Sequence, residues 1–223
     1  MRGLPVAPGF DQTESDSDSP RARFRKHLRG LGADLTEVGH HLRRAVPQID
    51  TDEEARLAVE ELVSHLGGVL GFHTSRDERE GIAIWGSPTG ITLVTRALGA
   101  GGLAGALAPL AQARDRRLAG TAAPARLVSA LGVVCGSRID WRQIEESLSM
   151  RRGLDAVRLV SVDRLLDLAV LRRDHVLAHP DAVVLLRPQG MNADALVELM
   201  ARRRYGQEED AAGPPGDAAW WIR

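Results

Sequence analysis

Cysteine, aromatic residues and long apolar runs are all scarce in this chain of 223 residues. Cys135 is the only cysteine, which excludes an intramolecular disulfide and a zinc site made of several thiolates. No apolar run reaches the ~20 residues that a membrane-spanning helix needs, and the first residues lack the apolar segment of a signal peptide. We therefore expect a cytoplasmic protein without a membrane segment.

An excess of charge of one sign is lacking as well. The formal net charge is −1, which argues against a surface that is basic everywhere, although a local basic patch is compatible with it. Only 4% of the residues are aromatic but 43% are hydrophobic, so aliphatic side chains must fill the core. The length predicts one domain of ordinary size.

The composition changes along the chain and divides it into four parts. Residues 1–20 are rich in Gly, Pro, Ser and Asp without apolar periodicity, which predicts a disordered acidic tail. Residues 21–47 predict an amphipathic helix, residues 48–205 an α/β domain, and residues 206–223 a second disordered tail.

The second tail ends in two tryptophans, Trp220 and Trp221. Large aromatic side chains at the end of a polar tail bury nothing unless they dock on a surface. We therefore take both as candidate partner-binding residues, and docking on this chain or on another protein stays open.

Apolar residues between Phe24 and Leu42 recur at spacings of four and three, which predicts one helix with a narrow apolar seam. The seam consists of Phe24, Leu28, Leu31, Leu35, Val38 and Leu42. A seam of this width suits one facing helix. Two interpretations stay open: packing on the chain's own core, or a symmetric homodimer through the helix Phe24–Leu42.

A basic run adjoins the acidic tail at the start of this helix. It consists of Arg21, Arg23, Arg25, Lys26 and Arg29. Such a run is either a solvated helix face or a set of contacts to the phosphates of nucleic acid. We take its five cations as candidate nucleic-acid-binding residues.

A second helix is predicted from Thr51, where Thr51 and Glu54 form a capping-box pattern, and its apolar face ends before Gly67 and Gly68. Three short strands follow, over Val69–Thr74, Gly81–Trp85 and Ile91–Arg96. A helix is then predicted over Leu103–Leu118, a strand over Leu127–Val134, a strand over Val157–Val162, and a Leu-rich helix with further short helices. The fold class is α/β, with parallel strands in the second half.

The order α-β-β-β-α-β from Thr51 to Gly136 resembles the core of the PD-(D/E)XK, or restriction-endonuclease-like, nuclease superfamily. The segment Val157–Leu186 (VRLVSVDRLLDLAVLRRDHVLAHPDAVVLL) is similar to the segment that follows the core in Mrr-like members. The resemblance implies a restriction-endonuclease-like core with an N-terminal helix and C-terminal short helices, and it implies DNA or RNA as the partner.

In that superfamily an acidic residue opens the second strand, a (D/E)-x-K triplet lies on the third, and the carboxylates hold Mg²⁺. The nearest match to the triplet is Val94-Thr95-Arg96, in which valine cannot ligate a cation. We therefore predict no metal site, no cofactor and a catalytically degenerate nuclease fold that binds nucleic acid or a protein partner. Arg96 is a further candidate phosphate contact.

Two alternatives stay open. An active, Mg²⁺-dependent endonuclease would need a migrated set of catalytic residues, drawn from Asp77, Glu80, Arg96, Glu60 and Glu61. Helical geometry places Glu60 and Glu61 on opposite flanks of the apolar face of their helix, so neither is predicted to point at the sheet. A protein-interaction module would instead use the apolar seam and the two C-terminal tryptophans.

Overall fold

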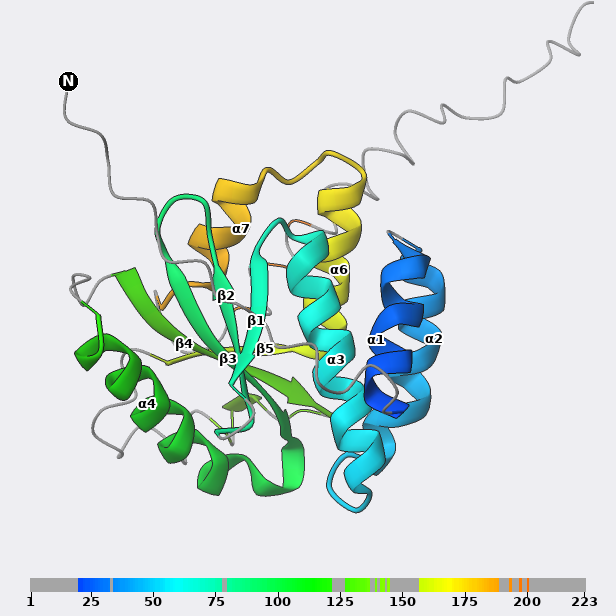
Figure 1. Ribbon diagram of the computed structural model, residues 1–223, viewed down its shortest axis with the longest axis horizontal. Helices are drawn as coiled ribbons and strands as arrows, with labels where there is room; N and C mark the ends of the chain where they lie inside the picture. The colour runs from blue at the N-terminus through cyan, green and yellow to red at the C-terminus, as the bar shows by residue number, and fades with distance from the viewer. Residues whose placement is uncertain are drawn as a thin grey trace, which may run out of the picture.

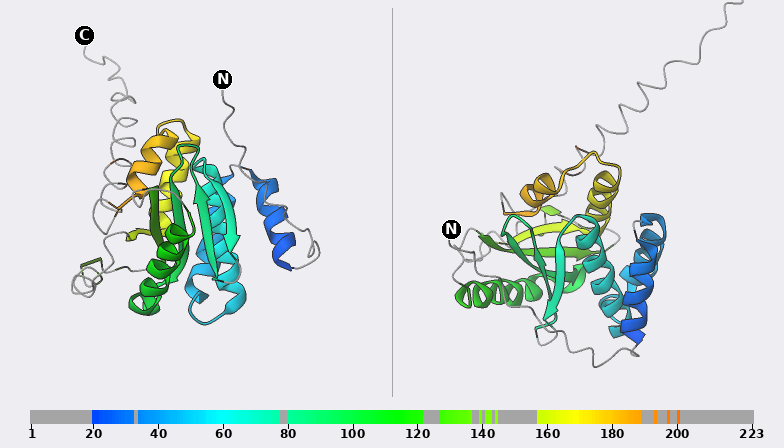
Figure 2. Two further views of the ribbon diagram at one scale, coloured as in Figure 1. Left: turned by 60° about the vertical axis from the view of Figure 1, so that its left-hand side comes forward. Right: turned by 45° about the horizontal axis from the view of Figure 1, so that its top comes forward.

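The computed structural model of the chain (Figures 1 and 2) describes residues 20–32, 34–77, 80–121, 127–136 and 157–188, together with positions 139, 141, 142, 144, 193, 197 and 200. Residues 1–19 and the C-terminal segment with Trp220 and Trp221 lie outside the described residues. None of the described helices is both long and apolar enough to cross a membrane.

Five strands form one mixed sheet in the order β1-β2-β3-β4-β5. Their bounds are β1 His73–Asp77, β2 Ile82–Gly86, β3 Thr92–Gly99, β4 Val128–Cys135 and β5 Val157–Ser161. β1, β2 and β3 are an antiparallel meander, whereas β3, β4 and β5 run parallel. The mixed α/β class predicted from the sequence is therefore confirmed, and the helix before the meander and the helix between β3 and β4 are both present.

Helices cover both faces of this sheet (Figure 2). The helix α3 (Glu53–Val69) packs on one face together with α6 (Val162–Arg173) and α7 (His179–Leu186). The helix α4 (Leu103–Ala119) packs on the opposite face. The two faces are named below after α3 and α4.

The N-terminal segment is a pair of helices and not the single helix predicted over Phe24–Leu42. α1 (Pro20–Leu31) ends at a turn in which Gly32 has a φ of +57°, and α2 (Leu35–Ala45) begins after Asp34. The Asp34 carboxylate accepts hydrogen bonds from the backbone N–H groups of Thr36 and Glu37, so it caps α2. The His65 ring on α3 donates a hydrogen bond to the Gly32 carbonyl at 2.9 Å.

The apolar seam of this hairpin faces the chain's own core. Its residues Leu28, Leu35, Val38 and Leu42 are all less than 5% exposed and belong to the same cluster as the interior of α3. Because the two helices fold back on each other, both halves of the seam reach that cluster. The surface that a dimer through one long helix would use is therefore buried within the chain.

The helix α3 differs from its prediction at both ends. Its N-cap is Asp52, which accepts from Glu54 N–H, while the Thr51 hydroxyl donates to the Gln48 carbonyl of the short helix η1 (Val46–Gln48), so the predicted capping box is wrong. The helix also continues through its glycine pair and stops before Gly71, whose φ of +95° requires glycine. The first strand consequently begins four residues later than predicted.

The strand β3 extends beyond its predicted end at Arg96. It pairs with β2 only as far as the Thr95–Ala83 position, whereas β4 accompanies it to its last residue. The stretch Arg96–Gly99 therefore has β4 on one side and no registered β2 partner on the other. A short helix η2 (Ala100–Gly102) then leads into α4.

Candidate functional site

Two adjacent glutamates on α3, Glu60 and Glu61, are buried, with 5% of each residue exposed. The sequence placed them on opposite flanks of the helix, with neither predicted to point at the sheet. In the structure α1 covers one flank of α3 and β1 covers the other. Each flank therefore faces protein and not solvent.

Arginines from α1 bind the carboxylate of Glu61. Arg21 Nε lies 2.6 Å from Glu61 Oε1, and Arg25 donates from Nε to Oε2 and from Nη2 to Oε1, both at 2.9 Å. Burial alone would raise the pKa of Glu61, but the hydrogen bonds from Arg25 and Arg21 outweigh it and the pKa lies below its usual value. Glu61 is therefore a carboxylate that fastens α1 to α3.

The carboxylate of Glu60 is bound from the other side. Arg56, one turn earlier on α3, lies 2.5 Å from Glu60 Oε1, and Arg76 on β1 donates to Oε2. Arg21 Nη2 also approaches Oε2, at 3.7 Å. Four arginines thus surround two buried glutamates, and a metal ion could reach either carboxylate only by displacing guanidinium groups.

Side chains alternate along β3, so the two end residues of its predicted triplet, Val94 and Arg96, face away from these glutamates. Val94 belongs to the cluster beneath α4, and Ala97 belongs to the cluster beneath α3. Because side chains alternate along a strand, Arg96 faces the α4 side and Thr95 faces the α3 side. The side chains nearest in register to Arg76 on the α3 face are Ala83 and Thr95, and neither can supply a carboxylate.

Asp77 and Glu80 lie on the other side of the sheet from Glu60 and Glu61. Asp77 is paired in register with Ile82, which packs in the cluster beneath α4. Glu80 accepts a hydrogen bond at 2.7 Å from Arg116 on α4. The structure therefore does not bring the proposed migrated residues together, and within the described residues no three His, Cys, Asp or Glu side chains are placed to hold a metal ion.

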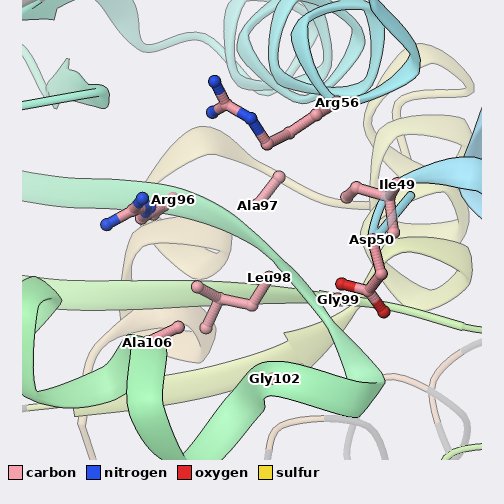
Figure 3. Close-up of a pocket in the computed structure, with 9 residues that line it drawn as sticks. All are labelled: Ile49, Asp50, Arg56, Arg96, Ala97, Leu98, Gly99, Gly102 and Ala106. Carbon is pink, nitrogen blue, oxygen red and sulfur yellow. The ribbon is translucent and has the colours of Figure 1, made fainter. Parts of the chain in front are cut away.

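Arg96 instead lines a crevice at the carboxyl end of β3 (Figure 3). The crevice lies between the start of α3 and the start of α4 and has a volume of about 140 Å³. The described residues that line it are Ile49, Asp50, Arg56, Arg96, Ala97, Leu98, Gly99, Gly102 and Ala106. Arg96 is half-buried and makes no hydrogen bond or ion pair with any described residue.

The basic run of α1 is divided between two sides of the helix. Arg21 and Arg25 point inward to Glu61, as described above. Arg23, Lys26 and Arg29 are exposed and form no ion pair with any residue that the structure describes. Only these last three of the five predicted contacts are therefore free for a phosphate.

The second helix of the hairpin adds two exposed cations that sequence reasoning missed, Arg43 and Arg44. The His41 ring on α2 lies 5.7 Å from the rings of Phe24 and His27 on α1, so the C-terminal half of α2 lies beside the N-terminal half of α1. We call the outward cations Arg23, Lys26, Arg29, Arg43 and Arg44 the basic face. The sequence signal that could have revealed them is the Asp34 cap, because it places Arg43 and Arg44 on a separate helix that folds back beside α1.

A third polar contact joins α7 to the turn between β2 and β3. The His179 Nδ1–H donates to the Leu70 carbonyl at 2.8 Å, and Nε2 accepts from the Ser87 hydroxyl at 2.8 Å. The Ser87 oxygen also accepts from Thr89. All hydrogen-bonding capacity of this serine is thus used within the chain, which assigns it to holding α7 in place.

Neither a model of a known protein family, nor a curated protein, nor a solved structure matches this chain. The features of the molecule that bear on its function are the basic face, the arginine-bound glutamates and the crevice.

Proposed function

We propose that this chain is a cytoplasmic nucleic-acid-binding protein, built on a restriction-endonuclease-like core that has lost metal-dependent catalysis. The observation that carries the proposal is the basic face. Its five cations lie on one helical hairpin and have no ion-pair partner among the described residues, although the chain as a whole has a net charge of −1. Selective clustering of this kind is typical of a phosphate-binding surface.

The dimensions of the hairpin suit an extended polyanion. α1 has 12 residues and so spans roughly 18 Å at 1.5 Å per residue. Duplex DNA carries on the order of ten phosphates over such a length, at about one per 1.7 Å of axis. Several phosphates can therefore lie along α1, and binding would be governed by the release of counterions.

The nuclease-like core is supported by the order and direction of its elements. α3 precedes an antiparallel meander, α4 follows it, and β4 lies parallel to β3. This is the α-β-β-β-α-β order on which the resemblance to the PD-(D/E)XK superfamily rests.

The loss of catalysis is supported by the side chains that face α3. A magnesium site of the superfamily's kind needs oxygen ligands from the strands and often from the helix. Ala83 and Thr95 provide no strand carboxylate, and the helical carboxylates Glu60 and Glu61 are bound by guanidinium groups. These residues do not fit Mg²⁺, which prefers oxygen ligands that are free to coordinate it.

Fluorescence anisotropy with labelled 30-mer duplex DNA, single-stranded DNA and single-stranded RNA tests the proposal. We expect saturable binding that weakens steeply with salt, and no cleavage above background with Mg²⁺ or Mn²⁺. The variant R43Q/R44Q should bind more weakly. The matched variant R116Q/R117Q, which removes two adjacent arginines from α4, should bind like the wild type.

Cleavage that depends on Mg²⁺ and is lost in Glu80→Ala would overturn the catalytic part of the proposal. Absence of binding at low salt, or equal loss in both double variants, would overturn the binding part. Retention of a protein from an extract without any affinity for the three nucleic acids would instead favour a protein partner.

A further inference from the structure

The crevice at the carboxyl end of β3 is separate from the basic face and has its own charge pattern. Figure 3 shows Arg56 and Arg96 extending from α3 and β3 toward the same end of the crevice, with Asp50 at the opposite end. The floor between them is apolar and includes Ala97 and Leu98. A cavity of about 140 Å³ offers roughly ten times the space that a single water needs, so a small polar group fits there.

The two arginines differ in how much of their hydrogen-bonding capacity is free. Arg56 binds Glu53 and Glu60 through Nε, Nη1 and Nη2, which leaves part of its five-donor fork unused. Arg96 has no hydrogen bond or ion pair with any described residue. Arg56 is therefore already neutralised by two carboxylates, and Arg96 is the arginine of the crevice whose donors are left for an anion.

The start of α4 adds to the positive potential of the crevice. Gly102 is the N-cap and contributes no side-chain hydrogen bond, and the first turn of α4 contains no acidic residue. Gly102 and Ala106 both line the crevice. The uncapped N-terminal amides of a helix favour an anion nearby.

Among the described residues of the lining, Asp50 is the one carboxylate, and its position is fixed by a glycine. A Cβ atom on Gly99 would overlap the Asp50 side chain, so the carboxylate lies directly against the backbone at the end of β3. It is held at the end of the crevice away from Arg56 and Arg96. An incoming anion is therefore directed to the arginine end.

We infer that this crevice binds a phosphate-class oxyanion between Arg96 and the start of α4. The chemistry is shared by free phosphate, a phosphate monoester and the terminal phosphate of a nucleic-acid strand. The inference does not depend on the basic face, and it stands if that face binds no nucleic acid.

The test is a titration of the ¹⁵N-labelled full chain with inorganic phosphate, with sodium chloride at matched ionic strength as the reference. We expect saturable shifts of the backbone signals of Gly99, Gly101 and Gly102 and of Arg96 Nε. Arg96→Gln should weaken binding at least tenfold. Asp50→Asn removes the carboxylate of the described lining without changing its shape and should tighten phosphate binding about threefold.

Two further variants separate a binding site from a folding effect. Ala106→Leu fills the crevice without altering its charge and should weaken phosphate binding as Arg96→Gln does. Arg117→Gln removes an exposed charge from the same helix outside the crevice and should leave binding unchanged. Absence of saturable shifts, shifts confined to α1 and α2, or weaker binding in Asp50→Asn would overturn the inference.

Oligonucleotides identify the source of the anion. If 5′-phosphorylated strands bind more tightly than 5′-hydroxyl strands in the wild type but not in Arg96→Gln, the ligand is a strand end. If phosphate binds and the two strands do not differ, the ligand is free phosphate or a small monoester. The variant R43Q/R44Q distinguishes the two surfaces, because it should weaken oligonucleotide binding and leave phosphate binding intact.

Discussion

The inner and outer sides of α1 carry the same kind of side chain but differ in what those side chains contact. On the inner side, Arg21 and Arg25 bind the buried carboxylate of Glu61. On the outer side, Arg23 and Lys26 are exposed and make no ion pair with a described residue. The partner of a cation, and not its presence in a basic run, therefore decides whether it can bind phosphate.

Helical periodicity explains the division. Arg21, Arg25 and the buried Leu28 are separated by four and three residues, so they share one face of α1. Arg23 and Lys26 lie on the opposite face. The inner arginines therefore stabilise the docking of α1, and the outer cations are free to act on a partner.

The largest effect on stability is expected where the helical hairpin of α1 and α2 packs on the core of the chain. Leu35 is 3% exposed, so Leu35→Glu would bury a charge without a partner and should lower the free energy of unfolding by roughly 4 kcal/mol or more. Thr36→Glu, at the exposed neighbouring position of α2, is the control and should change it little. Urea denaturation measures both. A folded monomeric Leu35→Glu derived from a dimeric wild type would show instead that the seam is an intermolecular interface.

A smaller decrease in the free energy of unfolding is expected at the inner side of α1. Glu61→Gln leaves Arg21 and Arg25 without their carboxylate and should cost about 2 kcal/mol of unfolding free energy, less than the 3–5 typical of fully buried pairs because both arginines are partly exposed. Glu54→Gln removes an exposed charge from the same helix and should stay within about 0.5 kcal/mol of the wild type. Equal unfolding free energies of the two variants would show that the ion pairs on the inner side of α1 do not stabilise the protein.

The pH dependence sharpens this difference further. The folded-state pKa of Glu61 lies below its ordinary value of 4.5, so its contribution to stability is fully present above about pH 5 and is lost as the pH falls through the folded-state pKa. The difference in unfolding free energy between the wild type and Glu61→Gln should be constant from pH 7 to about pH 5 and then shrink. A difference that grows in acid would contradict the assigned direction of the shift.

The smallest effect is expected at Cys135, which is buried without a cationic partner. Burial raises the pKa of its thiol to about 12, and the charges of Asp163 and Asp50 act in the same direction. At pH 8 the thiol should not react with a disulfide reagent until the protein unfolds. If the folded protein reacts as fast as an unhindered thiol does, the end of β4 is accessible to the reagent and the predicted protection is wrong.

The elements that the sequence predicted well have local signals of their own. The helix α4 and the strand β4 agree with their predicted ranges within one or two residues, because a strong apolar pattern is bounded by glycine in both. The break between α1 and α2 was missed for a physical reason. The apolar spacing continues through the turn, although Gly32 and Asp34 together signal the end of one helix and the cap of the next.

The charged cluster could not be predicted from a single helix. A helical projection places Glu60 and Glu61 relative to the apolar face of α3, but it does not contain α1 or β1. Arg76 lies beyond the predicted end of the first strand at Thr74, but in the structure it belongs to β1 and its side chain reaches Glu60. Burial of both glutamates follows from tertiary contacts between segments up to 40 residues apart.

The salt dependence of duplex DNA binding can show whether the outer side of α1 binds phosphate and the inner side does not. Two variants each remove two charges from α1. R23Q/K26Q changes the outer side, and R21Q/R25Q changes the inner side. Each lost phosphate contact lowers the slope of log K against log salt by roughly 0.9, so the outer variant should lose roughly 1.8 of the slope while the inner variant, measured where it is folded, keeps the wild-type value. An equal loss in both variants, or no loss in the outer one, would contradict the division of α1 into a paired inner side and a phosphate-binding outer side.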